Sequence, residues 1–490
     1  TKVGFKVVLS PRSNKELFEK GIETIPSDTV CYPAKLVHGH IQALIEQNVD
    51  RIFYPSVVFE QNQFADAQNH FNCPIVQSYP EVIANNFDEI RAGKVDYRHP
   101  YFDLSKPEVV AQNLAECFND FPISIEEWQT AVTEGFAELT RCREDIQQKG
   151  EDLLEKMLLK NQRGIVLAGR PYHLDPEIHH GIAEMMIQEG FHVFTEDSIA
   201  HLGDVEKLRV VNQWMYHSRL YAAAKVVSHT PSLELVQLNS FGCGIDAVTC
   251  DQVQEILNRH HRLYTVLKID EGTNLGAVRI RLRSLKAAID EREQKTMLDY
   301  SEVVVPDSIV FTKEMKKKHT ILLPMLSPIH QEGLLDQAFQ ACGYNVVSLP
   351  TENSQAIDVG LRFVNNDACY PAIISIGQLL EALQSGEYDL NNTSVMLTQT
   401  GGGCRATNYI PLLRKALSDA GFAQIPVISL SMGNKGVESS PGFKLTIPLV
   451  KRIALAAMYG DLFERVVYRT RPYEKNQGEV NRWYDHYLEI

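Results

Sequence analysis

Apolar residues form short runs that alternate with segments of helical periodicity. Ile165–Gly169 is a short buried-strand pattern, Pro176–Glu189 has the apolar spacing of a helix, and Gly190–Phe194 predicts a second strand after a glycine stop. The same order of strand, helix, glycine and strand recurs from Ile321 to Val347. Because this order is typical of βαβ units, the pattern predicts an α/β fold with largely parallel sheets.

The chain also repeats a longer segment. Residues 4–8 (Gly-Phe-Lys-Val-Val) precede the Cys-Tyr-Pro-Ala tetrapeptide of residues 31–34, and residues 343–347 (Gly-Tyr-Asn-Val-Val) precede the same tetrapeptide at residues 369–372. A glycine lies eight residues after the cysteine in both copies. We interpret the repeat as a duplication and predict a strand at residues 4–8. Because no strand and helix precede that strand, we expect the chain to be a piece of a longer polypeptide.

The pattern predicts three α/β domains, of which the first and third are related by the duplication. A charged helical stretch from 124 to 160 is expected to end the first domain. The resulting boundaries are residues 1–160, 161–312 and 313–490. From about residue 447, the third domain is expected to continue as a long C-terminal helix with a polar tail.

Composition is that of an ordinary globular protein. The 490 residues are 44% hydrophobic, and 48 basic against 62 acidic side chains give a formal charge of −14. A negative balance argues against nucleic acid as a partner, since nucleic-acid binding needs a basic surface. The sequence has no apolar run of the roughly 18 residues of a membrane span and no apolar leader, so we expect a cytoplasmic protein that does not bind a membrane. Nine cysteines without a Cys-x-x-Cys pair indicate reduced thiols, free or bound to metal.

Eight of the nine cysteines fall into two groups by position. Three lie inside helical patterns, where a buried thiol acts as a small hydrophobic group: Cys117, Cys142 and Cys342. Five lie at turns beside glycine or before a predicted helix: Cys31 and Cys73 in the first domain, Cys243 in the second, and Cys369 and Cys404 in the third. Unpaired backbone N–H groups lower a thiol pKa and favour the thiolate that binds metal. Thiolates with no histidine at metal spacing favour an iron–sulfur cluster assembled between domains, and tight turns without metal remain the alternative.

A second candidate lies directly after the first strand of the middle domain. Arg170 and His173 follow Ile165–Gly169, where open α/β sheets bind ligands at the carboxyl ends of their strands. We consider both residues candidates for cofactor binding through a phosphate group. Capping of the turn is an equally weighted alternative.

Several segments resemble one known family. They are Ser27–His40, Phe53–Ser56, Asn72–Val76, Leu167–His173, Asn239–Asp246 and Thr400–Tyr409. They resemble the C-terminal region of the large 2-hydroxyacyl-CoA dehydratase activase-related proteins, in which an activator-type ATPase part precedes a region similar to the iron–sulfur subunits of 2-hydroxyacyl-CoA dehydratase and benzoyl-CoA reductase. The resemblance implies flavodoxin-like, Rossmann-like domains that hold a [4Fe–4S] or double-cubane cluster.

The resemblance also implies ligands and partners. Cys31, Cys73 and Cys243 match the family's three-thiolate pattern, and Cys369 and Cys404 match its second set; whether the two sets share one cluster stays open. An activator-type ATPase domain is expected upstream in the same or another chain. We further expect a small-molecule substrate, with an acyl-CoA as one candidate, and a homodimer as one assembly state.

The function expected from the resemblance is ATP-driven, low-potential electron transfer to a small molecule in anaerobic metabolism. If the chain is an enzyme, it is a reductase or dehydratase component that depends on the cluster. Two alternatives remain: a non-catalytic electron-transfer or assembly module, and a metal-free α/β protein that binds a small molecule.

Overall fold

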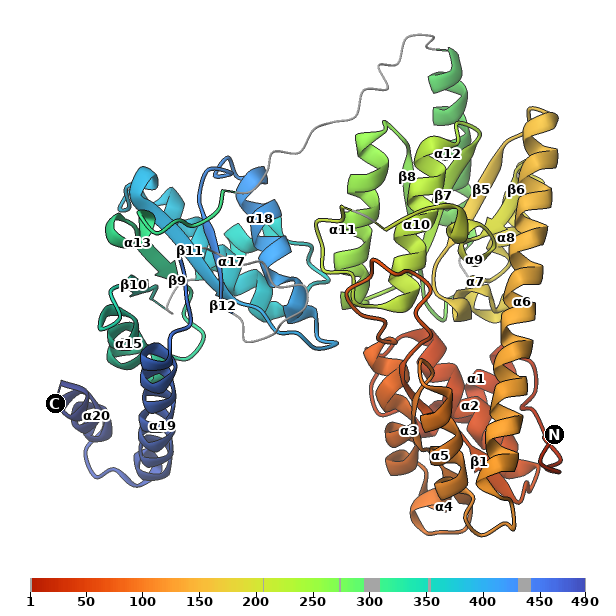
Figure 1. Ribbon diagram of the computed structural model, residues 1–490, viewed down its shortest axis with the longest axis horizontal. Helices are drawn as coiled ribbons and strands as arrows, with labels where there is room; N and C mark the ends of the chain where they lie inside the picture. The colour runs from red at the N-terminus through yellow and green to blue at the C-terminus, as the bar shows by residue number, and fades with distance from the viewer. Residues whose placement is uncertain are drawn as a thin grey trace. The chain divides into compact units, whose positions relative to one another are not determined.

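The computed structural model describes residues 2–205, 207–272, 275–294, 309–350, 354–430 and 442–489, and it has the predicted α/β architecture (Figure 1). It divides into two compact units, Thr1–Val304 and Val305–Ile490. Strands pair in parallel in every sheet of the described residues. No helix of this part of the chain is long and apolar enough to cross a membrane.

The N-terminal part of the first unit has two small sheets among helices. Strand β1 (Arg51–Phe53) pairs with β3 (Asp96–Arg98), and β2 (Ser56–Phe59) pairs with β4 (Tyr101–Asp103). The helices are α1 (Lys15–Gly21), η1 (Ile22–Thr24), α2 (Tyr32–Glu46), α3 (Pro74–Asn86), α4 (Asp88–Arg91), α5 (Pro107–Cys117) and α6 (Ile125–Leu159). Helix α6 confirms the predicted charged helix, and it contacts both α5 and the later strand β6, residues His192–Thr195 (Figure 1).

The strand predicted at Gly4–Val8 is wrong, because residues 5–10 have no regular secondary structure. Phe5 packs against Phe118 and Phe121, but the side chains of Val7 and Leu9 are 60% and 83% exposed. A strand needs a neighbouring strand for its backbone hydrogen bonds, and this segment pairs with none in the structure as described. The duplication therefore does not extend to this strand.

A larger sheet lies in the second half of the first unit. Its strand order is β6-β5-β7-β8. The strands are β5 (Gly164–Ala168), β6 (His192–Thr195), β7 (Leu233–Ser240) and β8 (Tyr264–Ile269). The helices are η2 (Pro171–Leu174), α7 (Pro176–His179), α8 (Ile182–Gln188), α9 (Glu196–Ile199), η3 (Ala200–Leu202), α10 (Met215–His229), α11 (Gly244–Arg259) and α12 (Leu275–Gln294). From β5 the chain continues to β6 on one side of that strand, and from β6 it crosses to β7 on the other side. This reversal makes the carboxyl ends of β5 and β7 a topological switch point.

The prediction of a single helix over Pro176–Glu189 is wrong in one respect, because the structure has two helices there, α7 and α8. His180 and Gly181 between them have φ angles of 52° and 82°, in the left-handed region that ends a helix. The predicted strand that follows is confirmed as β6.

The second unit repeats this sheet topology, with strand order β10-β9-β11-β12. The strands are β9 (Thr320–Leu323), β10 (Asn345–Ser348), β11 (Thr393–Thr398) and β12 (Val427–Leu430). The helices are α13 (Met315–Lys318), α14 (Pro328–His330), the π-helix η4 (Gln331–Leu335), α15 (Asp336–Gln340), α16 (Ser354–Phe363), α17 (Tyr370–Gln384), η5 (Leu390–Asn392), η6 (Arg405–Asn408), α18 (Tyr409–Asp419), α19 (Ile447–Thr470), η7 (Arg471–Tyr473) and α20 (Glu479–Glu489). Helix α19 confirms the predicted C-terminal helix.

The sequence repeat corresponds to one local structure, a pair of closely packed helices. Helix α1 packs on α2 in the first unit, and α16 packs on α17 in the second. A Cβ atom added to Gly39 of α2 would lie 1.9 Å from the Leu17 carbonyl oxygen, and one added to Gly377 of α17 would lie 1.8 Å from the Ala356 carbonyl oxygen. The glycine eight residues after each repeated cysteine therefore allows the same backbone approach in both units.

Candidate cysteine site

Three of the predicted cysteines begin helices of the first unit. Cys31 is the N-cap of α2, Cys73 of α3 and Cys243 of α11, and none of the three side chains accepts a capping hydrogen bond. Proline suits the first turn of α2 and α3, because backbone N–H groups in a first turn have no hydrogen-bond acceptor within the helix and proline lacks that group. The sulfurs therefore lie beside helix N-termini, where the partial charge is positive.

Arg170 connects these cysteines. It follows β5, its side chain is 2% exposed, and its Nη2 donates to the Cys243 sulfur at 3.0 Å and to Asp246 at 2.7 Å. Cys31 and Cys73 each lie close enough to the Arg170 guanidinium to interact with it electrostatically. The first unit thus brings three predicted cysteines around a predicted cofactor residue at the switch point of its larger sheet.

The thiol pKa values differ from the expectation. Burial raises the pKa of Cys31, although the Arg170 charge acts to lower it. Burial likewise raises the pKa of Cys243 to about 11, against the lowering effect of Arg170. For Cys31 and Cys243, the expectation of a lowered pKa was wrong because removal of the thiolate from water outweighs the helix N-termini.

A buried polar network surrounds the arginine. The Asp246 carboxylate also lies 3.6 Å from His217 Nε2, and the neighbouring charges hold the pKa of Asp246 well below its usual range despite burial. His173 Nδ1 accepts the Arg170 backbone N–H at 3.1 Å, which caps the turn of η2. Burial lowers the pKa of His173 to about 3, so its ring is neutral at pH 7. Its Nε2 is buried with no partner among the described atoms.

The remaining two predicted cysteines lie together in the second unit. Cys369 is the N-cap of α17, and Cys404 is the N-cap of η6 after β11. The Cys369 sulfur lies 2.7 Å from the Tyr409 hydroxyl, and both thiols act electrostatically on that hydroxyl. Cys404 is exposed. A tyrosine hydroxyl therefore lies beside one thiol of this pair and solvent beside the other, whereas the buried Arg170 and Asp246 lie beside Cys243 in the first unit.

None of the three cysteines predicted to pack in cores is fully buried. Cys117 and Cys342 are half-buried, but Cys142 is exposed, and its assignment as a buried packing residue is wrong. Helix α6 buries only four of its 35 residues and presents most others to solvent. Cys250, which the sequence pattern did not single out, lies on α11 and accepts hydrogen bonds from Gln237 and Asn239, both at 3.5 Å.

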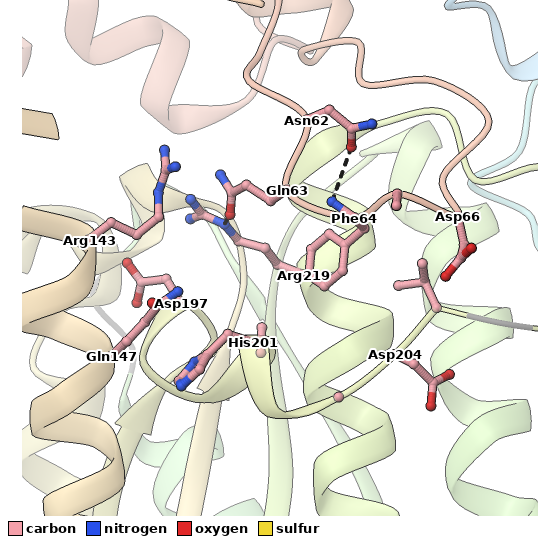
Figure 2. Close-up of a pocket in the computed structure, with 14 residues that line it drawn as sticks. Asn62, Gln63, Phe64, Asp66, Arg143, Gln147, Asp197, His201, Asp204 and Arg219 are labelled. Carbon is pink, nitrogen blue, oxygen red and sulfur yellow. Dashed lines mark hydrogen bonds between the residues drawn. The ribbon is translucent and has the colours of Figure 1, made fainter. Parts of the chain in front are cut away.

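A pocket of about 440 Å³ lies beside the carboxyl end of β6 (Figure 2). Arg143 of α6 and Arg219 of α10 line it, together with residues 62–66 of the loop after β2. Gln63 accepts from Arg219 Nε at 3.0 Å, and burial with the neighbouring Arg219 charge lowers the pKa of Arg143. The same loop ends at Cys73, so it lines the pocket at one end and the cysteine site at the other.

Comparison with known proteins adds one relation. Residues 1–199 match the family model of the CoA enzyme activase uncharacterised domain, which relates this part of the chain to activase-type proteins. The matched range contains Cys31, Cys73, Arg170 and His173. No curated protein and no solved structure matches the chain.

Proposed function

We propose that the chain is an iron–sulfur protein of the acyl-CoA dehydratase activator system, which accepts low-potential electrons from an activator-type ATPase and passes them to a small-molecule substrate. The observation that carries the proposal is the convergence of Cys31, Cys73 and Cys243 on Arg170. The activase relation of residues 1–199 supports the system in which we place it.

The donor set suits a cluster in three ways. All three donors are thiols, which iron–sulfur clusters prefer. Helix N-termini and a buried guanidinium surround them, and both stabilise the negative charge that thiolates and sulfides bring. Arg170 already donates to the Cys243 sulfur, and hydrogen bonds to cluster sulfurs are one way in which a protein adjusts reduction potential.

The raised thiol pKa values are compatible with this assignment. A buried thiol stays protonated until a metal replaces its proton, so binding would release protons in the physiological range. Cys31, Cys73 and Cys243 would hold the cluster, which would supply one-electron chemistry at low potential. Three protein ligands leave the fourth iron of a cubane without a protein thiolate.

We place the substrate in the pocket lined by Arg143 and Arg219. Three carboxylates also line this pocket, those of Asp66, Asp197 and Asp204, but its two neighbouring guanidinium groups suit an anionic group such as a phosphate of coenzyme A. With a coenzyme A thioester as the probe, isothermal titration calorimetry should show at least tenfold weaker binding by Arg143→Gln. The matched control is Arg141→Gln on the same helix, whose side chain is 71% exposed. Equal binding by Arg143→Gln and the unchanged chain would contradict this placement.

The proposal as a whole is tested by anaerobic reconstitution with iron and sulfide. We expect about four irons and four sulfides for each cubane, with broad visible absorbance. Cys243→Ser should lose iron, whereas Cys342→Ser should retain it. A chain that takes up no iron and sulfide would instead be the metal-free binding protein.

A further inference from the structure

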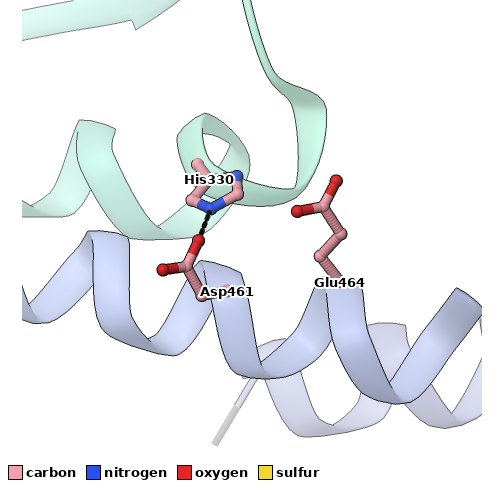
Figure 3. A group of neighbouring side chains, drawn as sticks. All are labelled: His330, Asp461 and Glu464. Carbon is pink, nitrogen blue, oxygen red and sulfur yellow. Dashed lines mark hydrogen bonds and ion pairs between the residues drawn. The ribbon is translucent and has the colours of Figure 1, made fainter. Parts of the chain in front are cut away.

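A second group of possible metal ligands lies in the other unit, far along the chain from the first-unit cysteines. Nitrogen or oxygen atoms of His330, Asp461 and Glu464 lie within 4.8 Å of one another (Figure 3). His330 ends α14, and the two carboxylates lie three residues apart on α19, so they extend from the same side of that helix. His330 Nε2 lies 2.9 Å from Asp461 Oδ1.

The histidine is held in the orientation that a metal ligand needs. The Ser327 hydroxyl lies 2.8 Å from His330 Nδ1. If Nδ1 carries the proton and donates to this hydroxyl, Nε2 presents its lone pair toward the carboxylates. Ligating histidines commonly have such a hydrogen bond on the nitrogen that does not bind the metal.

Gly460 makes room for this ring. A Cβ atom at position 460 would lie 2.3 Å from His330 Cδ2 and 2.9 Å from Nε2. Any larger residue would therefore push the imidazole away from α19 and from the neighbouring Asp461. The close approach of the ring to the helix backbone depends on glycine at this position.

The local charge favours a cation. Two carboxylates face one imidazole, and Glu464 forms no hydrogen bond or ion pair with another side chain in the described ranges. The backbone directly after His330 is the π-helix Gln331–Leu335, a rare conformation that is common at functional sites. Asp461 is 77% exposed, so water can complete the coordination of an ion.

We propose that His330, Asp461 and Glu464 bind a divalent first-row transition-metal ion. One imidazole and two carboxylates suit ions such as Mn²⁺, Fe²⁺ and Zn²⁺, which accept mixed nitrogen and oxygen ligands. This site is independent of the cysteine site and of the function proposed for it.

The test uses Mn²⁺ with the full chain, because the thiols of this protein would compete for Zn²⁺. Electron paramagnetic resonance of free Mn²⁺ measures how much is bound. We expect one saturable Mn²⁺ per chain. His330→Ala and Glu464→Gln should each weaken binding at least tenfold, and Asp485→Asn, an exposed acid on α20, should leave it unchanged.

Gly460→Ala gives a sharper test, because it keeps all three ligands and moves only the ring. It should also weaken Mn²⁺ binding at least tenfold, while circular dichroism without metal shows the same helix content. Saturable binding that persists in both His330→Ala and Gly460→Ala would overturn the proposal, as would the absence of saturable Mn²⁺ binding by the unchanged chain.

Discussion

The two units carry the same cysteine-bearing helix pair in different surroundings. In each, glycine lets two helices pack at backbone contact, and a cysteine begins the second helix. In each, another cysteine follows the third strand of a four-stranded sheet: Cys243 after β7 and Cys404 after β11. The first unit adds a third cysteine near this pair, together with a buried Arg170–Asp246 ion pair.

The difference shows that the repeated scaffold positions thiols but does not by itself define their chemistry. In the first unit, burial and a fixed positive charge surround the thiols. In the second, Cys369 has a tyrosine hydroxyl as its neighbour and Cys404 is exposed. We therefore propose the first unit, and not the second, as the place of the principal cluster.

The largest expected effect comes from the buried ion pair. Arg170→Met should lower the free energy of unfolding of the first unit by about 3–5 kcal/mol, because Asp246 would stay buried without its partner. Urea unfolding followed by tryptophan fluorescence measures it, since Trp128 and Trp214 lie in this unit.

Two controls accompany this change. Arg170→Met combined with Asp246→Asn should recover most of the loss, because no unpaired charge remains. Arg405→Met in the second unit should cost less than about 1 kcal/mol, since the Arg405 guanidinium donates a long hydrogen bond, of 3.4 Å, to the Asp367 carbonyl. Equal costs for Arg170→Met and Arg405→Met would contradict the contrast between the units.

The next largest difference expected between the two units is in the alkylation rates of their thiols. The pKa of Cys243 is raised to about 11, so in the metal-free protein its alkylation by iodoacetamide should rise about tenfold per pH unit from pH 8 to pH 10. At pH 8, exposed Cys404 should react faster than buried Cys243, as followed by peptide mass spectrometry. A Cys243 rate that levels off near pH 8 would mean that its thiolate is stabilised more than burial allows.

The pKa of Cys243 also sets the sign of a stability change. Folding raises this pKa, because burial favours the neutral thiol. The thiol therefore makes its full contribution to the free energy of unfolding below the pKa of an unfolded cysteine, about 8.5. That contribution is lost as the pH rises toward about 11. The first unit of the metal-free protein should therefore lose stability between pH 8.5 and pH 11. Cys243→Ser should remove that part of the pH dependence.

The two helix pairs, α1–α2 and α16–α17, should lose similar amounts of stability when their close-contact glycine is replaced by alanine. Gly39→Ala and Gly377→Ala should each cost about 1–3 kcal/mol, because the new methyl group would overlap a carbonyl oxygen of the partner helix. Gly135→Ala on α6 is the matched control: its Cβ would have no atom within 4 Å, and alanine should stabilise the helix by up to about 1 kcal/mol. A neutral result at only one of the two tight positions would mean that the packing of the pairs differs.

The smallest expected effect is at the tyrosine of the second unit. Tyr409→Phe removes the hydroxyl that lies 2.7 Å from the Cys369 sulfur, and should cost about 1 kcal/mol. Iron content of the reconstituted protein should not change. Loss of iron in this variant would move the principal cluster toward the second unit.

Local features of the fold were predictable from sequence, and long-range ones were not. The helix starts at Cys31 and Cys369 follow from proline in the first turn, and α6 follows from its charged periodicity. The predicted strand at Gly4–Val8 failed because a strand depends on a partner that its own residues do not specify.

The candidate site shows the same limit. Its turn cysteines could be selected by position, but the pairing of Arg170 with Asp246 joins residues 76 apart, and no local pattern indicates it. The direction of the thiol pKa shifts depends on burial, which is a property of the whole unit. His330 and Asp461 are 131 residues apart, which is why sequence spacing alone did not suggest a site there.

The central claim is that Cys31, Cys73 and Cys243 hold one cluster. The most direct measurement is a crystal structure of the anaerobically reconstituted chain with anomalous scattering at the iron edge. We predict iron within bonding distance, about 2.3 Å, of all three sulfurs, with Arg170 beside the cluster. Iron bound only at Cys369 and Cys404, or no iron near Arg170, would contradict the account.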